Sequence, residues 1–364
     1  MAKKIKTSDK FDDATSSQIV KKYGDVVRIG TDVFEETKNL TIIPVSPNID
    51  MALGGGFREG TWVVLSGDPK TGKTTTALQF AANCQKKEHG NRKIIYVNVE
   101  GRLSAMNFEG VHGLDASKIT VVESSYEPLS AEEYLDIIEQ YVKQEPECII
   151  IVDSTSSLLP ERELNDSVSG EYRAGLPKLL ANFTKKLGGV VTKQKAIIIL
   201  ITHFIANTSG RGYKQKLADG GNMIQYQAQT NVEVKYTKPW EVSGRQIGQM
   251  VVWKIICSSA GGFPGGEAQS WLRYGHGLDY VQELIHSGCE LGLVSKSGAW
   301  YTCNFALENL DLLSDLLKEN EIDASDTEKV TKFFKFQGQE RLRTFISEHP
   351  KLLDIMSSEL RDML

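Results

Sequence analysis

Gly67-Asp68-Pro69-Lys70-Thr71-Gly72-Lys73-Thr74 is the stretch of sequence that decides the fold, because it fits the pattern G-x-x-x-x-G-K-[ST]. A continuous apolar run, Trp62–Ser66, precedes it and predicts a buried strand. A helix-forming segment, Thr74–Lys87, follows it. A strand, a glycine-rich turn and a helix in this order predict a phosphate-binding loop rather than a chance glycine-rich turn.

Each part of this loop has a physical task. The glycines let the backbone wrap around a phosphate so that successive N–H groups point at it, and the helix N-terminus adds the positive end of its dipole. Lys73 would place a point charge on the β- and γ-phosphates, and Thr74 would bind Mg²⁺ through its hydroxyl. We therefore expect the loop and the adjoining Thr75 to bind ATP and Mg²⁺.

Apolar runs alternate with amphipathic helical stretches along the middle of the chain. Continuous apolar strands are typical of a parallel sheet that is buried on both faces. The predicted class is therefore α/β, with a mostly parallel twisted sheet and helices on both faces. Three later runs have no helices between them and predict hairpins that extend the sheet. The further strands are Ile94–Val97, Ile119–Val122, Cys148–Val152 and Ala196–Thr202, the further helices Ala131–Lys143 and Leu176–Lys193, and the later runs Thr230–Tyr236, Met250–Ile256 and Ala268–Tyr274.

Three of these strands lead into a polar side chain that can do chemistry. Asp153 ends the run before it and would hold Mg²⁺ through water, because ligands bind at the carboxyl ends of parallel strands. Glu100 ends the stretch Tyr96–Glu100 and would orient the attacking water, with a helix cap or a surface acid as the alternative. His203 ends a fourth run and would sense the γ-phosphate, although a lone histidine at a strand end is more often only a hydrogen-bonding residue.

Two polar segments follow Asp153 and His203 and are candidates for DNA contact. Long polar segments inside a compact domain are usually functional or disordered. Basic and aromatic side chains with glycine-rich backbone suit single-stranded DNA, whereas two solvated loops are the alternative. The first segment, Glu161–Gly170, carries Arg162 but three acids. The candidate residues of the second are Phe204, Arg211, Tyr213, Lys214, Lys216, Gly220, Gly221 and Asn222.

The chain is expected to have three regions. Residues 1–40 form a polar arm with a helix near Ser17–Tyr23 and a strand-like Val26–Ile29, which folds back or packs on another subunit. Residues 41–278 form the ATPase core with the two DNA segments. Residues 279–364 form a small α-rich domain whose helical pattern is interrupted at Gly298–Tyr301.

Composition narrows the class of protein. The net charge is −5, so nucleic-acid binding would need a local basic surface or backbone amides. No segment is apolar enough for a signal peptide or a membrane span, so no membrane partner is expected. The five cysteines show neither zinc-ligand nor disulfide spacing and predict a reducing compartment. We expect the cytoplasm, which is that of a bacterial host if a phage encodes the chain.

The motifs together resemble one family. They extend over nearly the whole chain, and three of them, DGGNMIQYQ, YGHG and KSGAWY, are far less widespread than a phosphate-binding loop. By these motifs the chain resembles the RecA recombinases, and within them the RecA-like proteins of phages. The matching segments beyond the phosphate loop are Gln18–Gly30, Ile49–Gly60, Val99-Glu100, Val152–Pro160, Asp219–Gln227, Tyr274–Gly277 and Lys296–Tyr301.

This resemblance implies a DNA-dependent ATPase that pairs homologous strands. Glu100 looks like the family's catalytic glutamate, and His203 stands where bacterial relatives usually carry glutamine and T4-type phage recombinases carry histidine. The segments after Pro160 and His203 resemble the two DNA-binding loops. The N-terminal arm is similar to a segment that docks on the neighbouring subunit, which builds a helical homo-oligomeric filament on single-stranded DNA. The C-terminal region resembles a domain that engages double-stranded DNA, and a recombination mediator or a single-strand binding protein is an implied partner.

Two departures from the family pattern stand out. The family places a basic pair before the YGxG segment, reaching ATP across the subunit interface, whereas Ile256–Gly261 here reads ICSSAG. Serines cannot supply that charge, and Lys254 or Arg273 are the candidate substitutes. Where an adenine-stacking aromatic is expected, this chain has Asn107, followed by Phe108.

Two other functions remain open at this point. A hexameric helicase would share the phosphate loop, Asp153 and Glu100, but it needs an arginine finger that the serine-rich stretch does not offer. An ATP-binding mediator or regulator that assembles with a true recombinase would explain the missing basic pair.

Overall fold

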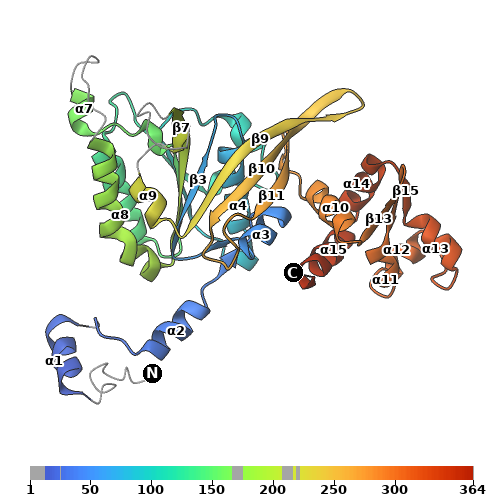
Figure 1. Ribbon diagram of the computed structural model, residues 1–364, viewed down its shortest axis with the longest axis horizontal. Coiled ribbons are helices and arrows are strands. Elements are labelled where there is room, and N and C mark those ends of the chain that lie inside the picture. The colour runs from blue at the N-terminus through green and yellow to red at the C-terminus, as the bar shows by residue number, and fades with distance from the viewer. Residues whose placement is uncertain (1–12, 25, 166–174, 207–215, 219–221, 364) are drawn as a thin grey trace. The chain divides into compact units, whose positions relative to one another are not determined.

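The computed structural model describes residues 13–24, 26–165, 175–206, 216–218 and 222–363 (Figure 1). The chain divides into two compact units, Met1–Thr41 and Ile42–Leu364. We describe each unit by itself.

The first unit is helical where it is described. Helix α1 (Ala14–Tyr23) begins at Asp13, whose side chain accepts a hydrogen bond from the Ser16 N–H at 2.6 Å. It confirms the helix that the sequence predicts here, and α2 (Gly30–Lys38) follows. The strand predicted over Val26–Ile29 is wrong: the described residues of this unit contain no strand, so the β-branched run has no ladder to join.

A large, mostly parallel sheet forms the centre of the second unit. Among the described residues it has ten strands in the order β12-β11-β10-β9-β3-β7-β6-β4-β5, with β8 paired to β7. The pairs β3–β7, β3–β9, β4–β5, β4–β6 and β6–β7 are parallel. The bounds are β3 (Thr61–Gly67), β4 (Ile94–Asn98), β5 (Ile119–Val122), β6 (Ile149–Asp153), β7 (Ile197–Ala206), β8 (Lys216–Ala218), β9 (Thr230–Val242), β10 (Arg245–Cys257), β11 (Glu267–Arg273) and β12 (Gly277–Leu278).

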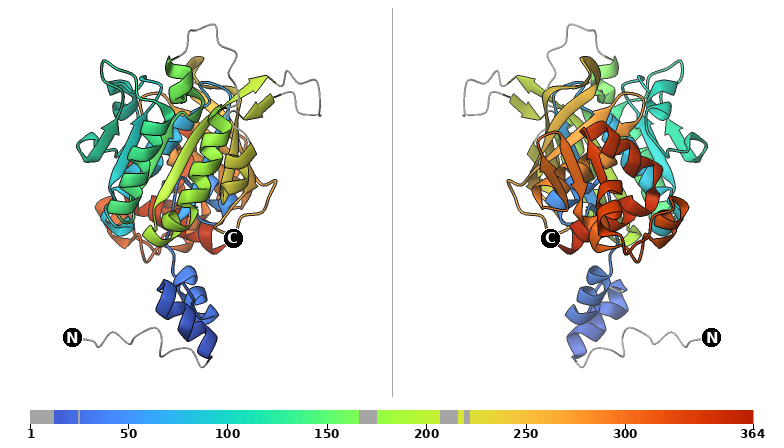
Figure 2. Two further views of the ribbon diagram at one scale, coloured as in Figure 1. Left: turned by 90° about the vertical axis from the view of Figure 1, so that its left-hand side faces the viewer. Right: turned by 90° about the vertical axis from the view of Figure 1, so that its right-hand side faces the viewer.

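Helices cover both faces of this sheet, because successive residues of a strand point to opposite sides. Val63 and Leu65 pack with α4 on one face, whereas Trp62 and Val64 pack with α6 and α8 on the other. Figure 2 shows α6 and α8, in green, in front of the sheet in its left view. This arrangement confirms the predicted α/β class. The helices are α3 (Pro47–Leu53), α4 (Lys73–Cys84), α5 (Ala105–Glu109), α6 (Ala131–Gln144), α7 (Glu161–Asn165), α8 (Gly175–Gln194) and α9 (Asn222–Gln227), beside a two-stranded sheet of β1 (Ile42–Ile43) and β2 (Phe57–Arg58).

The three later runs extend the sheet as antiparallel strands, as the sequence predicts. Strands β9 and β10 form a long hairpin, and β11 pairs with β10. The turn of the hairpin is Ser243-Gly244, with φ of 52° and 77°. Two consecutive residues at positive φ give a turn whose twist matches the flanking strands, and glycine adopts that conformation without strain.

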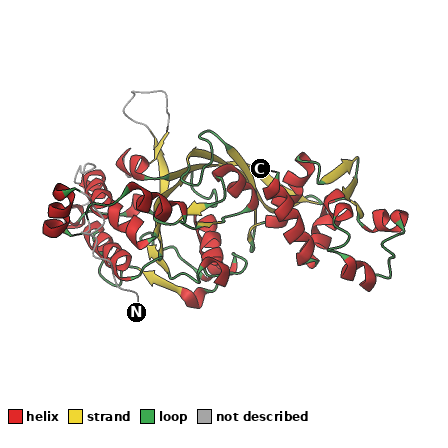
Figure 3. Cartoon of the chain, turned by 90° about the horizontal axis from the view of Figure 1, so that it is seen from below, coloured by secondary structure: helices red, strands yellow, loops and turns green. Residues whose placement is uncertain are grey.

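The C-terminal region mixes helices with a small antiparallel sheet (Figure 3). The sequence predicts an α-rich domain here and does not indicate the small sheet, in which β13, β14 and β15 pair in the order of their numbers. The predicted break at Gly298–Tyr301 includes the turn between β13 and β14, where Gly298 has a φ of 58°. The elements are α10 (Tyr280–Glu290), β13 (Val294–Ser297), β14 (Trp300–Cys303), α11 (Asn304–Glu308), α12 (Ser314–Glu319), α13 (Thr327–Phe333), β15 (Lys335–Gln337), α14 (Gln339–Glu348) and α15 (Pro350–Asp362).

Two acids, one of them fully buried, lie where α10 packs on α3. Glu283 is 0% exposed and accepts a hydrogen bond from the Asn48 N–H at 3.0 Å. Burial raises the pKa of Glu283 to about 7, and burial also raises the pKa of Asp50 well above its usual value. The Glu283 carboxyl is therefore held in its neutral form at mildly acidic pH.

This burial predicts a pH-dependent stability. Because the pKa of Glu283 is raised in the folded protein, its protonation contributes stability that is fully present below the unfolded pKa of 4.5. This contribution of about 3 kcal/mol is lost as the pH rises through the folded pKa of about 7. Glu283→Gln should therefore unfold with nearly the wild-type free energy at pH 4.5 and be more stable than the wild type at pH 8. Urea titrations at both pH values test this. Glu290→Gln, an exposed position on the same helix, should leave the pH dependence unchanged.

No helix among the described residues is long and apolar enough to span a membrane.

Candidate nucleotide-hydrolysis site

The predicted phosphate loop connects β3 to α4, with Gly72 at a φ of 91° directly before the helix. A Cβ on Gly67 would lie 2.5 Å from the Val234 carbonyl oxygen, and one on Gly72 would lie 2.2 Å from Leu272 Cδ1. The first contact is with backbone and leaves no room for a side chain at Gly67, whereas the second would require the end of the Leu272 side chain to move. Packing therefore favours glycine at position 67, and the positive φ favours it at position 72.

Lys73 is a buried cation inside this loop, with 4% of its surface exposed. Its Nζ donates to the carbonyl oxygens of Gly67 at 2.9 Å and Asp68 at 2.8 Å. Burial lowers its pKa to about 8, against the opposing effect of Asp153, Asp68 and Glu100. An anion that joined Lys73 would offset its desolvation, so the loop fits the phosphates of a nucleotide.

A hydroxyl and a carboxylate meet beside the loop. Thr74 Oγ1 donates to Asp153 Oδ2 at 2.7 Å, and the Tyr96 hydroxyl donates to the same oxygen at 2.6 Å. Burial raises the pKa of Tyr96, so the phenol stays a neutral donor. Mg²⁺ prefers oxygen ligands of this kind, and Thr74 with Asp153 could hold it. The sequence reasoning missed Tyr96, which lies on β4 and is brought to Asp153 by the pairing of β4 with β6.

Glu100 lies two residues after the end of β4. Its Oε1 accepts hydrogen bonds from Ser154 Oγ at 2.6 Å and His203 Nε2 at 2.8 Å, and its Oε2 lies 3.3 Å from Arg102 Nη1. Burial acts to raise the pKa of Glu100, but the hydrogen bonds from Ser154 and His203 outweigh it and the pKa is lowered. The group is therefore an ionised carboxylate that is able to accept a proton from water.

His203 lies at the same edge of the sheet as the phosphate loop. In the pairing of β3 with β7, Gly67 stands opposite His203. The His203 N–H also donates to Ser156 Oγ at 3.1 Å, just after β6. The sequence places the end of the strand at His203, and this is wrong, because β7 continues to Ala206.

The strand continues because it gains a partner inside the second predicted DNA segment. Strand β8 pairs antiparallel with β7, so that Phe204 faces Ala218 and Ala206 faces Lys216. The flanks of this segment are therefore a β-hairpin rather than a loop. Asn222 begins α9. Five predicted DNA contacts lie outside the described residues: Arg211, Tyr213, Lys214, Gly220 and Gly221.

The first DNA segment is only partly described. Its start is helix α7, which carries Arg162, and residues 166–174 lie outside the described part. The structure places Arg162 on the exposed surface of this short helix.

The serines that replace the family's basic pair are occupied within the chain. Ser258 Oγ donates to the Leu53 carbonyl oxygen at 2.6 Å, and Ser259 Oγ lies 3.0 Å from Thr230 Oγ1. These hydroxyls join the end of β10 to α3 and β9. They therefore serve packing at the end of β10.

The two candidate substitutes for that pair also have acidic neighbours. Lys254 stands between Glu233 on β9 and Glu267 on β11, its direct partners across the strands. Arg273 Nη1 lies 3.6 Å from Asp279 Oδ2, and its guanidinium lies 5.8 Å from the centre of the Trp240 ring.

Two further side chains, Gln249 and Asn107, have contacts that the sequence did not indicate. Gln249 Nε2, on β10, donates to the Lys70 carbonyl oxygen at 2.9 Å. Asn107, at the expected adenine-stacking position, instead accepts from the Ser104 N–H at 2.9 Å at the start of α5. Neither contact could be read from sequence spacing, because one joins distant segments and the other depends on where a helix begins.

Comparisons with known proteins agree with this geometry. The sequence profile of the RecA N-terminal domain matches residues 10–279, which is more than half of the chain. Protein RecA of Oleidesulfovibrio alaskensis is 28% identical over 313 residues, covering 84% of this chain and 85% of the relative. Protein RecA of Nitratiruptor sp. is 25% identical over 353 residues, covering 96% and 92%, and that of Sulfurovum sp. is 26% identical over 357 residues, covering 97% and 92%. The chain therefore belongs to the RecA family, whose members are recombinases and DNA-dependent ATPases.

Proposed function

We propose that this chain forms a helical filament on single-stranded DNA and uses ATP to pair homologous strands and exchange them. The observation that carries the proposal is the placement of His203. Its Nε2 donates a hydrogen bond to Glu100 Oε1 at 2.8 Å, it lies opposite Gly67 of the phosphate loop, and it is followed on the same strand by the β7–β8 hairpin. One strand thus connects the hydrolysis site to a predicted DNA segment.

This connection supports coupling between nucleotide and DNA. A ligand shifts a conformational equilibrium only if it interacts differently with the two states. A γ-phosphate beside Glu100 and His203 would change their hydrogen bond, and β7 carries that change to the hairpin that begins at Phe204. Binding of ATP would then favour the arrangement that holds DNA, and hydrolysis would release it.

The roles of the site residues follow from their contacts. Gly67–Thr75 would hold the triphosphate, with Lys73 on its β- and γ-phosphates and Thr74 and Asp153 on Mg²⁺. Glu100 would take a proton from the attacking water, and His203 would hold Glu100 in place. Bound ATP supplies the phosphoryl group, and Mg²⁺ neutralises the charge that develops on it.

The regions of the chain suggest how the filament is built. The arm, residues 1–40, would dock on the next subunit, and a head-to-tail contact of this kind does not close into a ring. The core, residues 41–278, would hold ATP and single-stranded DNA.

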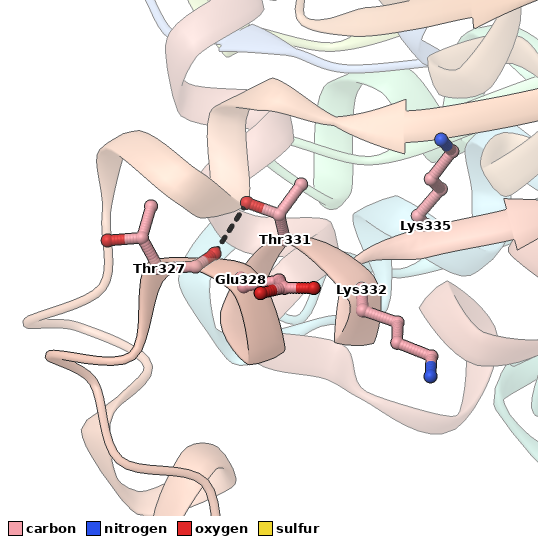
Figure 4. A pocket seen from close by; sticks show the side chains of 5 residues that line it. All are labelled: Thr327, Glu328, Thr331, Lys332 and Lys335. Atoms are coloured by element: carbon pink, nitrogen blue, oxygen red, sulfur yellow. Dashed lines mark hydrogen bonds between the residues drawn. The ribbon is translucent and has the colours of Figure 1, made fainter.

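The C-terminal domain, residues 279–364, would contact duplex DNA through some of its lysines. Lys335 Nζ lies 5.4 Å from the centre of the Trp300 ring, and Lys296 Nζ lies 5.4 Å from that of Tyr301. A shallow hollow of about 550 Å³ lies beside them and is lined by Thr327, Glu328, Thr331, Lys332 and Lys335 (Figure 4). Lysines supply the sequence-independent attraction to phosphates that duplex binding requires.

A phage-type recombinase is the finer assignment that we propose. Histidine at position 203 and the motif DGGNMIQYQ support it. Such a protein would act in the cytoplasm of a bacterial host, together with a recombination mediator or a single-strand binding protein.

Electron microscopy and a strand-pairing assay test the proposal together. With ATP and single-stranded DNA, we expect continuous helical filaments, ATP hydrolysis that DNA stimulates, and joint molecules with a homologous duplex. Closed rings would favour the helicase. Filaments without DNA-stimulated hydrolysis would favour the regulator, which the occupied Ser258 and Ser259 keep as the second candidate.

A further inference from the structure

Hydrolysis of ATP needs positive charge where the γ-phosphoryl group leaves. An arginine that meets this group, from the same chain or from a partner, raises kcat by about 10³ to 10⁵ in enzymes that transfer phosphoryl groups. In this chain Ser258 and Ser259 stand where the family's basic pair is expected, and both are hydrogen-bonded inside the chain. An additional cation beside Lys73 and Mg²⁺ would therefore have to be a residue other than these two serines.

The obvious substitutes are poorly placed for this task. Lys254 is flanked across the sheet by Glu233 and Glu267. Arg273 is paired with Asp279, a residue that is 1% exposed. Moving Arg273 to a nucleotide would separate it from the acid that now pairs with it, and Lys254 would have to leave a position between two acids of the neighbouring strands.

Arg102 is differently placed. It follows Glu100 by two residues, and its Nη1 lies 3.3 Å from Glu100 Oε2. Its side chain is 84% exposed, whereas that of Glu100 is 14% exposed. Among the ion pairs between described residues, this is the one that joins an arginine or lysine to Glu100, and an exposed guanidinium can change partner at little cost.

We propose that Arg102 is a catalytic arginine that acts on ATP bound to its own subunit. This inference rests on the proposed ATP hydrolysis and names a further residue of the same site. When the triphosphate binds, the guanidinium turns from Glu100 Oε2 to the γ-phosphate oxygens. The turn stabilises the developing charge and frees Oε2.

The chemical step balances with these groups. The oxygen of a water molecule forms a bond to the γ-phosphorus while the bond from that phosphorus to the β–γ bridging oxygen breaks. The proton of the water passes to the Glu100 carboxylate, and the electron pair of the broken bond stays on ADP. Arg102 keeps its proton throughout and acts only through charge and hydrogen bonds.

Kinetics of Arg102→Ala give the first test. We expect kcat for DNA-stimulated hydrolysis to fall by about 100-fold or more, with the KM for ATP changed by less than about threefold. Arg102→Lys should keep only part of the activity, because lysine lacks the planar fork of donors. Since the side chain is exposed, added guanidinium chloride should restore part of the activity of Arg102→Ala, and sodium chloride at equal ionic strength should not.

A binding measurement gives a readout besides turnover. Aluminium fluoride with ADP imitates the transferring phosphoryl group, so it should tighten nucleotide binding to the wild type. Arg102→Ala should bind ADP as the wild type does and lose most of that tightening in calorimetry. Arg341→Ala, an exposed arginine on α14, should behave as the wild type in both assays.

The outcomes separate this inference from the proposed function. A wild type that does not hydrolyse ATP would overturn both. Two results would overturn the inference alone, provided that the wild type hydrolyses ATP. In the first, Arg102→Ala keeps the wild-type kcat. In the second, Arg102→Ala loses the binding of ADP and of ADP–aluminium fluoride equally. If the variant regains full kcat at higher pH, Arg102 only keeps Glu100 ionised and the proposal is wrong.

Discussion

Lys73→Ala is expected to lose ATP binding and hydrolysis, with kcat/KM lower by about 10³-fold or more. The reason is the position of the ammonium group, which is buried and held by two carbonyl oxygens of the phosphate loop. Alanine removes the charge that meets the β- and γ-phosphates and leaves those carbonyls without their donor. Fluorescent-nucleotide titration and a phosphate-release assay measure the two losses.

The same change should also abolish the formation of joint molecules. If the γ-phosphate controls the segments that hold DNA, a subunit that cannot retain ATP should bind single-stranded DNA weakly and without response to nucleotide. Lys87→Ala removes one lysine charge from the exposed turn beyond the other end of α4 and is the matched control. Full strand exchange by Lys73→Ala would show that the nucleotide mechanism is wrong.

The sheet was predictable because its strands are continuous apolar runs. The run Ile149–Val152 is completely or almost completely buried, and a run of this kind fits the centre of a parallel sheet. The small C-terminal sheet carries no such signal. Its strand β13, Val294–Ser297, reads VSKS, and three of its four residues are exposed. Short strands with polar faces look like turns in a sequence, so that sheet was missed.

The arm shows the opposite error. Val26–Ile29 has the composition of a strand. Composition shows that these side chains would fit a sheet, but it does not show that a partner strand is present. No described strand lies in this unit. The pairing of strands depends on the tertiary structure, which a local pattern does not contain.

The residues of the hydrolysis site were also predictable only in part. The phosphate loop, Glu100 after β4 and Asp153 at the end of β6 could be located because each lies within or next to a recognisable strand or motif. Tyr96 and Ser154 could not, because their contacts to Asp153 and Glu100 join residues that are more than fifty positions apart. Such contacts follow only from the order of the strands, here β7-β6-β4, which brings their carboxyl ends together.

Glu100→Gln is expected to separate hydrolysis from binding. Glutamine has the shape of glutamate, so its carbonyl oxygen can still accept from Ser154 and His203, but it cannot take a proton from water. We expect kcat to fall by about 10² to 10⁴-fold, while ATP is still bound. Because release of DNA would follow hydrolysis, ATP-dependent filaments of this variant should outlast those of the wild type.

The comparison with a second acid makes this prediction specific. Glu123 lies just after β5, at the carboxyl ends of the parallel strands, and it accepts a hydrogen bond from Asn98 Nδ2 at 2.7 Å. Glu123→Gln therefore removes the same charge as Glu100→Gln and leaves the proposed base, Glu100, in place. It should hydrolyse ATP as the wild type does. A stopped-flow measurement of DNA release after removal of free ATP distinguishes the two variants: only Glu100→Gln should slow it. If Glu100→Gln keeps its turnover, the base must be another group, and the hydrogen bond between Glu100 and His203 would serve to transmit the state of the nucleotide without taking part in the chemistry.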